Sequence, residues 1–330
     1  MTRPIDLTVA SRLLVIAPHP DDESLGCAGL IQRASACGAA VRVLVVTNGE
    51  NNPWPQRMLE RRLIIRDENR AAWGQRRRDE VLAAISLLGL CERDVVFAGL
   101  PDQGMTASLL NDANERSPLH AILHREMDAF TPTLIVGPSI ADTHPDHSAI
   151  AILVRLAISQ YPMLPLYEYI IHGHAKGDES HAHVVRLSAE QVAIKRAAIL
   201  CHRTQTSLSS RRFLAYANDT ERFFDARTPF ADHPIAAFHQ NGDGWQIELR
   251  PRRWFDRFSP ATVELLACQD GRIISHRQLK PAGRSMNLPT STLPPTARLF
   301  IKRQGGIGFF DEAGWRELQR APESSKASAV

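Results

Sequence analysis

Two short, almost wholly apolar runs near the start of the chain constrain its fold most strongly. Residues 13–17 read LLVIA and residues 41–47 read VRVLVVT, and between them small and apolar residues recur at helical spacing from 24 to 36. Apolar runs of this length are typical of strands that are buried on both faces, as in a parallel sheet. Strand, helix and strand in this order predict a βαβ unit.

The alternation of strands and helices continues as far as residue 201. The expected strands cover residues 95–98, 134–137, 166–171 and 184–187, and the expected helices cover 74–90, 117–130, 148–160 and, as the last one, 189–201. We therefore predict an α/β fold with a Rossmann-like, mostly parallel sheet that carries helices on both faces.

Beyond about residue 225 the pattern changes to alternating segments separated by turn residues, which is typical of an antiparallel sheet. The segments are 245–250, 262–267 and 298–302, and the turn pairs are Asp270-Gly271 and Gly305-Gly306. We predict a first, α/β domain in residues 1–225 and a small antiparallel β domain in residues 226–320, joined near Thr228-Pro229. A disordered tail is expected in residues 321–330.

Length and composition limit the kind of protein. A chain of 330 residues is long enough for one large domain or for a catalytic domain with a smaller companion. Its formal net charge of +3 does not indicate a nucleic-acid binder. The five cysteines are scattered, without CxxC pairs, and are interpreted as buried thiols of a reducing compartment. No leader segment or membrane span is recognised, so a cytoplasmic location is expected, and the oligomeric state is not predicted.

Two clusters of histidine and aspartate follow predicted strands. Residues 19–23 read HPDDE directly after the first strand, and residues 142–147 read DTHPDH after the strand at 134–137. Loops at the carboxyl ends of parallel strands converge on one edge of the sheet, where ligands bind. Acidic and imidazole groups packed this closely need a compensating cation or a hydrogen-bond network, and a divalent metal would serve.

The residue types favour zinc. Histidine nitrogen and aspartate oxygen bind zinc at about 2.0–2.2 Å, and a catalytic zinc keeps three protein ligands and one open position. We predict His19, Asp22 and His147 as the ligands of one Zn²⁺, with Fe²⁺ or another divalent metal as the alternative. Asp21 then lies beside the metal as a base.

A second prediction concerns the loop that carries His147. His144, if it is protonated, is predicted to stabilise an oxyanion, with Asp146 holding its ring. The alternatives are structural: HPDDE as a surface turn with a capping aspartate, and HPDH as a helix N-cap formed by Thr143 or Asp146.

At these residues the sequence resembles the LmbE-like, or PIG-L, family of zinc-dependent N-deacetylases. The first family signature stands at residues 18–23 and the second, HPDH, at 144–147. Further family-like features are residues 47–50, Arg77 with Glu80, residues 102–105, and Lys195 with His202 and Gln205. The resemblance covers about residues 11–210.

The resemblance implies a Rossmann-like fold and hydrolysis of an N-acetyl group on an amino sugar of the N-acetylglucosamine type. The carrier in such proteins is usually a lipid, a thiol-inositol, an antibiotic or a glycan. It also implies His19, Asp22 and His147 as zinc ligands and Asp21 as the general base.

By the same resemblance, Glu50, Arg77 and Asp102 are expected to contact the substrate. Arg77 lies in the charged run 76–80, which is also compatible with a solvated helix face. His202 is expected to be a hydrogen-bonded histidine near the site.

The segment from Asn51 to Gly74 is longer than a compact α/β loop requires. It contains Trp54, Trp73 and the arginines 57, 61, 62, 66 and 70. One hypothesis is that these arginines bind an anionic substrate, such as a lipid-linked sugar. The alternative is a helix whose charged side chains are merely solvated. The expected partners are an amino-sugar small molecule, a glycan or a lipid-linked sugar, and peripheral membrane contact stays open.

Three other functions compete with deacetylation. Two histidines and one carboxylate also bind iron in non-haem oxygenases, although Asp21 has no obvious task there. A non-catalytic sugar- or nucleotide-binding module is a second rival, but no phosphate-binding GxGxxG or GxxxxGK[ST] sequence follows a predicted strand. The third is an amidase that cleaves a larger amide of a sugar or thiol conjugate, since zinc and Asp21 would act on any amide carbonyl.

Overall fold

The computed structural model describes residues 4–173, 181–228, 236–241, 244–249, 262–280, 285–289, 294, 296–304 and 310–318. Gly305-Gly306, Pro229 and the expected disordered tail lie outside these residues. The first half of the chain forms β1 Arg12–Ala17, α1 Asp22–Gly26, α2 Ala28–Ala36, β2 Ala40–Thr47, α3 Pro53–Glu60, α4 Asp67–Leu87, η1 Glu92–Asp94, β3 Val95–Leu100, α5 Met105–Asn111, α6 Pro118–Phe130, β4 Leu134–Pro138 and α7 Pro145–Ala157. The second half forms η2 Ile158–Gln160, β5 Leu166–Tyr169, β6 His183–Arg186, α8 Ala189–Cys201, α9 Arg203–Leu214, β7 Thr220–Asp225, β8 Ala236–Asn241, β9 Gly244–Leu249, β10 Thr262–Gln269, β11 Arg272–Leu279, β12 Ser285–Pro289, β13 Arg298–Gln304 and β14 Arg316–Leu318.

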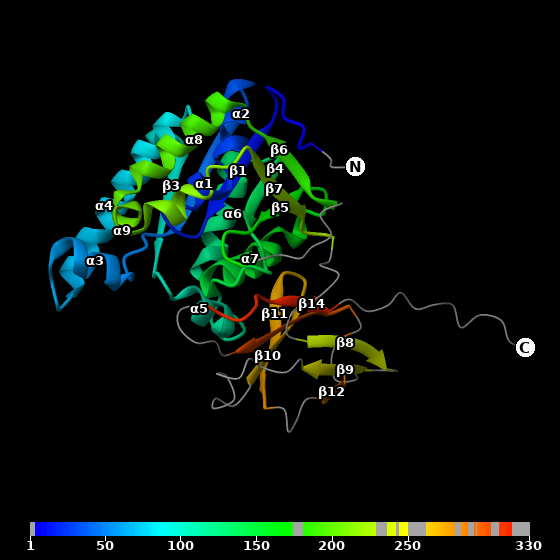
Figure 1. Cartoon of the computed structure of the whole chain (residues 1–330). Helices are drawn as coiled ribbons and strands as arrows, with labels where there is room; N and C mark the ends of the chain where they lie inside the picture. The colour runs from blue at the N-terminus through cyan, green and yellow to red at the C-terminus, as the bar shows by residue number, and fades with distance from the viewer. Residues whose placement is uncertain are drawn as a thin grey trace, which may run out of the picture.

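The main sheet has seven strands in the order β3-β2-β1-β4-β5-β7-β6 (Figure 1). The pairs from β3 to β5 are all parallel, as predicted. The last two strands are not: β7 runs antiparallel to β5, and β6 runs antiparallel to β7. The chain therefore reverses its strand order between β1 and β4, and in open α/β sheets ligands bind at such a point, outside the carboxyl ends of the strands.

Helices cover both faces of this sheet because β1 and β2 are apolar on both sides. Leu13 and Val15 of β1 pack into a core with α1, α2, α4 and α8, while Leu14 and Ile16 pack into a second core with α5, α6 and α7. Alternate residues of one strand thus anchor two helical layers. This arrangement confirms the predicted fold.

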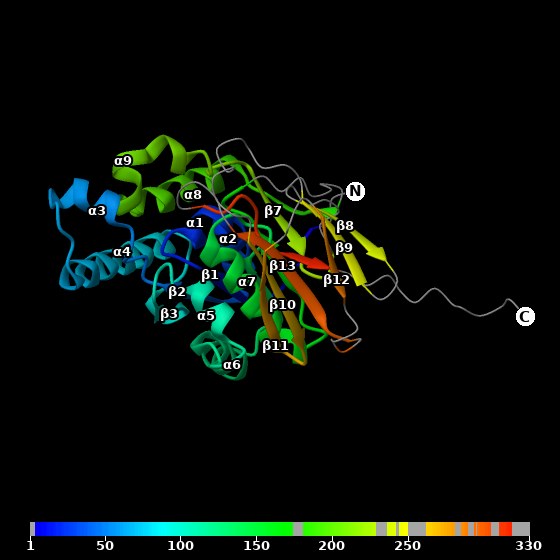
Figure 2. The ribbon, with the colours of Figure 1, turned by 90° about the horizontal axis from the view of Figure 1, so that it is seen from below.

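The C-terminal region forms a four-stranded sheet, β11-β10-β13-β14, and a three-stranded sheet, β12-β9-β8. Its β10–β11 hairpin turns at Asp270-Gly271, both with positive φ, as a type I′ turn requires. Leu266, Phe300 and Trp315 belong to the same apolar core as α7. Helix α7 is therefore enclosed between the main sheet and the C-terminal sheet (Figure 2), which explains why it is buried on all sides.

Three expectations from the sequence were wrong. The helix at 189–201 is not the last one, because α9 follows it and β7 then adds a strand to the main sheet. The helix expected at 74–90 begins earlier, because α4 runs from Asp67 to Leu87, and α3 precedes it within the segment 51–74. Cys37 and Cys91 are exposed, whereas Cys27 and Cys268 are buried as expected.

Within the described residues, no helix is long and apolar enough to cross a membrane.

Candidate metal centre

The two loops that carry the His/Asp clusters meet at the carboxyl ends of β1 and β4. Residues 19–23 leave β1, residues 139–147 leave β4, and the loops after β2 and β3 supply Glu50 and Asp102. His19, Asp21, Asp22, His144 and His147 are all buried. The two signature loops, more than a hundred residues apart in sequence, thus form one site, as predicted.

Asp21 has a strained backbone. Its φ of 141° lies in a region that side-chain-bearing residues rarely adopt, and such strain costs about 1–3 kcal/mol unless the surroundings impose it. Arg77 imposes it from α4: one guanidinium nitrogen donates to Pro20 O at 2.6 Å and lies 3.2 Å from Asp21 Oδ2. Glu23 accepts the Asp21 N–H at 3.0 Å. Strain held in this way is typical of functional sites.

Three ligand atoms form a compact triangle. His147 Nε2 lies 3.1 Å from Asp22 Oδ2 and 3.2 Å from His19 Nδ1, and His19 Nδ1 lies 3.4 Å from Asp22 Oδ2. Ligands of a tetrahedral zinc at 2.0–2.2 Å stand about 3.3 Å or slightly more apart. The side chains predicted as metal ligands are therefore spaced within about 0.2 Å of what a tetrahedral zinc ion requires.

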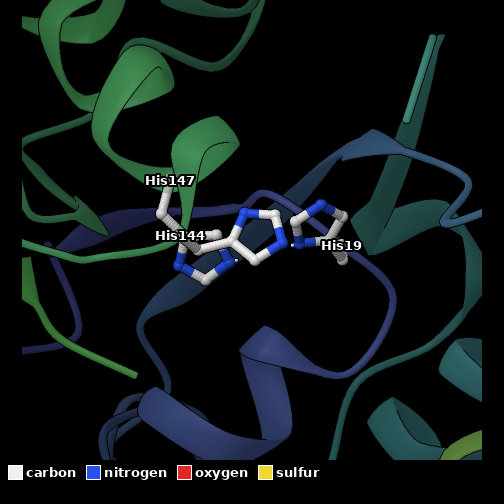
Figure 3. A group of neighbouring side chains, drawn as sticks. All are labelled: His19, His144 and His147. Atoms are coloured by element: carbon white, nitrogen blue, oxygen red, sulfur yellow. Dashed lines mark hydrogen bonds between the residues drawn. The ribbon is translucent and has the colours of Figure 1, made fainter. Parts of the chain in front are cut away.

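Other donor atoms surround this triangle. Within the described part of the chain, ligand atoms of His19, His144 and His147 lie within 4.8 Å of one another (Figure 3). The same limit holds for Asp22 with His147 and His172. His147 belongs to both sets, and His19 belongs to a third set with Asp102 and Asp146, so both histidines are central to the cluster.

Each of the two central histidines has a carboxylate at its other ring nitrogen. His147 Nδ1 lies 3.2 Å from Asp142 Oδ2, while His19 Nε2 lies 3.3 Å from Asp102 Oδ1 and 3.4 Å from Asp146 Oδ2. Such carboxylates orient metal-binding histidines and fix which nitrogen is free for the metal. Here the nitrogens left free for a metal are His19 Nδ1 and His147 Nε2, which both face Asp22 Oδ2.

The site gathers more negative than positive charge. Its buried carboxylates are Asp21, Asp22, Glu23, Asp102, Asp142 and Asp146, and a buried charge without a partner is costly. Burial lowers the pKa of His147, but the charges of Asp22 and Asp142 outweigh it and raise the pKa to about 9. Without a metal, the carboxylates therefore favour protonation of His19 and His147, whose pKa values are raised, and a divalent cation would supply the same positive charge.

His144 differs from the expectation. Burial, followed by the positive charge of His19 and His147, lowers the pKa of His144 well below its usual value. A neutral ring is favoured, whereas the predicted oxyanion role was conditional on a protonated ring. His144 is also the N-cap of α7, where its Nδ1 accepts the Asp146 N–H at 3.2 Å. The proton of the neutral ring is therefore on Nε2.

The support predicted for His144 also differs. The carboxylate of Asp146 does not hold the His144 ring but accepts the backbone N–H groups of Gln103 at 2.7 Å and Met105 at 3.1 Å, and it faces His19. Asp146 thus ties the loop after β3 to the start of α7.

The three residues expected to contact substrate make contacts within the protein. Glu50 Oε1 accepts the Asp102 N–H at 2.9 Å, and Asp102 Oδ2 accepts the Asn51 N–H at 2.9 Å. Arg77 is buried, not part of a solvated helix face, and also donates to Gly49 O at 3.0 Å. A Cβ on Gly49 would overlap this guanidinium. Their contact with substrate stays a prediction.

His202 is a buried, hydrogen-bonded histidine beside the site, as expected. Its Nε2 lies 3.0 Å from Glu23 Oε1 and 3.2 Å from Ser24 Oγ. Glu23 in turn holds the Asp21 backbone. His202 therefore supports the first signature loop.

Two aromatic rings near the site were not predicted. His172 lies 5.0 Å from the His147 ring between centroids, and Phe310 lies 4.9 Å from His172 and 5.6 Å from His144. The C-terminal segment that carries Phe310 is fixed to the second signature loop, because the N–H of Asp311 donates to Thr143 O at 2.9 Å. No local sequence signal marked Phe310, since its position depends on packing between distant segments.

Comparison with known proteins agrees with the resemblance. Residues 14–158 match the family model described as PIG-L, GlcNAc-PI de-N-acetylase. This segment, less than half of the chain, is similar to the PIG-L family, and we call it the PIG-L segment. It includes both signature loops, from His19 to His147.

Two curated relatives of the PIG-L segment are each named 1D-myo-inositol 2-acetamido-2-deoxy-α-D-glucopyranoside deacetylase. The protein from Nakamurella multipartita is 30% identical over 173 residues, which cover 47% of this chain and 58% of the relative. The protein from Mycobacterium avium is 33% identical over 150 residues, which cover 41% of this chain and 47% of the relative. The chain thus spans about half the length of the curated relatives that it matches.

A solved structure shares the fold. The crystal structure of a deacetylase triple mutant from the teicoplanin biosynthetic pathway matches with a TM-score of 0.51 and 21% identity, over 65% of this chain and 97% of the other. At this identity the likeness shows the α/β fold alone.

Proposed function

We propose that this protein is a zinc-dependent hydrolase that removes the N-acetyl group from an amino-sugar conjugate of the N-acetylglucosamine type. The observation that carries the proposal is the triangle of His19 Nδ1, Asp22 Oδ2 and His147 Nε2 beside Asp21, within a PIG-L segment. The names of the curated relatives, both deacetylases of a 2-acetamido sugar, support this class of substrate.

The donor set fits a zinc ion. Two imidazole nitrogens and one carboxylate oxygen are the ligand types of catalytic zinc sites, which leave one position open. Asp142 holds one of the two rings and Asp102 faces the other, as is usual around a metal. The excess negative charge of the buried carboxylates favours the binding of a divalent cation.

A zinc ion at these residues would polarise the amide carbonyl and make a water molecule more acidic. The protein supplies the proton transfers. Asp21 is held by Arg77 and by its imposed backbone, so its carboxylate has a fixed place from which to accept a proton from water. The Nε2–H of neutral His144 is the donor available for the oxygen that gains negative charge.

The experiment is a hydrolysis assay on a panel of N-acetylglucosamine conjugates, with and without oxygen, after metal removal and after reconstitution with Zn²⁺ or Fe²⁺. We expect equal amounts of acetate and free amine, independent of oxygen and restored by zinc. A dependence on oxygen would point to oxidation. Release of a longer acid without acetate would point to an amidase for larger amides, and sugar binding without turnover would point to a binding module.

A further inference from the structure

Five of the eleven exposed large apolar side chains of the described residues lie in one short segment. Residues 54–64 hold these five, with exposures from 37% for Leu59 to 92% for Leu63. Trp54, Met58 and Ile64 lie between these values. Exposed apolar side chains gathered in this way are typical of a surface that binds a protein or a membrane, because their contact with water is unfavourable.

This cluster forms a projecting tip. Trp54 and Met58 are four residues apart on α3 and therefore share one helix face, and Leu63 and Ile64 lie in the turn between α3 and α4. In Figures 1 and 2, α3 stands at one edge of the molecule, on the side opposite to β8, β9 and β12. We call residues 54–66 the α3 tip.

The α3 tip is also strongly basic. Its charged residues are the arginines 57, 61, 62 and 66 and one glutamate, Glu60, so its formal net charge of +3 equals that of the whole chain. Arg61, Arg62 and Arg66 are exposed, and the Arg57 guanidinium lies 5.6 Å from the Trp54 ring. Tryptophan and aliphatic side chains beside arginines are the composition of helices that lie in a membrane interface.

We propose that the α3 tip is a docking surface for a lipid bilayer with anionic headgroups. Its apolar side chains enter the interface and its arginines contact phosphate. A second copy of this chain fits less well, because a symmetric dimer through the tip would bring two positive surfaces together.

Helix α3 of the tip is attached to α4 by a hydrogen bond. Gln56 is fully buried and its side-chain amide donates to Asn69 O at 2.7 Å, which fastens α3 to α4. Helix α4 continues from the tip to Arg77, ten residues beyond Asp67 and about 15 Å along the helix axis. Docking would thus hold the candidate metal centre near the membrane surface. On the proposed function, this favours an amino sugar carried by a lipid.

The test is sedimentation of the full chain with vesicles of phosphatidylcholine alone or mixed with phosphatidylglycerol. We expect binding to the mixed vesicles and much weaker binding to the neutral ones. Arg61→Ala with Arg62→Ala should weaken it about fivefold per arginine at low salt, and less at high salt. Trp54→Ser with Leu63→Ser should weaken it about tenfold or more. Met163→Ser is the matched control, because Met163 is 87% exposed outside the tip, and it should leave binding unchanged.

Equal binding to both kinds of vesicle, or equal loss in the control, would overturn the proposal. Self-association that the tip variants abolish, without any vesicle binding, would assign the surface to a second copy. Inorganic phosphate at constant ionic strength should not release the protein, and release would point to a soluble anionic ligand. Vesicle binding requires neither metal nor turnover, so its failure is distinguishable from failure of the deacetylase proposal.

Discussion

Replacing Asp142 by asparagine should weaken zinc binding without removing any of the three proposed ligands. Asp142 Oδ2 accepts the N–H of Ile171 at 2.9 Å and of His172 at 3.1 Å and lies 3.2 Å from His147 Nδ1, while Oδ1 accepts the His144 N–H at 2.8 Å. An amide has only one acceptor oxygen, so at least one of these donors then faces an NH₂ group. This costs about 1–3 kcal/mol of folding free energy. The loss of a carboxylate behind a metal-binding histidine weakens metal affinity by about 10–100-fold.

The assay is zinc competition against a chromophoric chelator, together with thermal unfolding of the metal-free protein. Asp112→Asn is the matched control, because Asp112 also lies against a buried histidine, 3.3 Å from His120 Nε2, and accepts the Ser117 N–H at 2.7 Å. Both variants should be destabilised, but only Asp142→Asn should lose zinc affinity. An unchanged affinity in Asp142→Asn, or the same loss in both, would refute the assigned role of Asp142.

Three further predictions concern the supports of the site. Arg77→Lys keeps the charge but loses the forked guanidinium group that reaches three acceptors. We therefore expect kcat to fall about tenfold or more with zinc content unchanged. The control Arg78→Lys should have little effect on kcat. Phe310→Ala should raise KM for the acetylated sugar and leave zinc content unchanged; an unchanged KM would remove Phe310 from the substrate site. Burial raises the pKa of Glu317, but Arg298 and Arg155 outweigh it and lower the pKa below 4.5. The stability that Glu317 contributes is therefore complete above about pH 4.5 and is lost as the pH falls through the lower, folded-state pKa. The difference in melting temperature between the wild type and Glu317→Gln should therefore shrink on acidification. A constant difference would contradict this role of Glu317.

The central part of the fold was predictable because its strands and helices have clear apolar patterns in the sequence. The runs at 13–17 and 41–47 became β1 and β2, and the helix expected at 189–201 is α8 within the same bounds. Helix α9 was missed because its sequence, RTQTSLSSRRFL, has no apolar stripe. Contacts with distant residues hold it, since Thr204 donates to Glu80 through both its N–H and its hydroxyl.

The candidate site was predictable where its residues follow strands and not where distant segments fold over it. HPDDE and HPDH could be placed on one sheet edge from their position alone. The three consecutive arginines 76–78 point in different directions around α4, and the sequence does not tell which one faces inward; the structure buries Arg77. The place of Phe310 depends on the C-terminal sheet packing against α7, which no local pattern predicts.

The most direct test of the proposed metal centre compares two neighbouring aspartates. Zinc content and acetate release are measured for Asp21→Asn and Asp22→Asn after reconstitution with zinc. We expect Asp21→Asn to keep one zinc ion per chain and to lose turnover, and Asp22→Asn to lose both. If both variants keep their zinc, or if Asp21→Asn still turns over at the wild-type rate, the assignment of ligand and base is wrong.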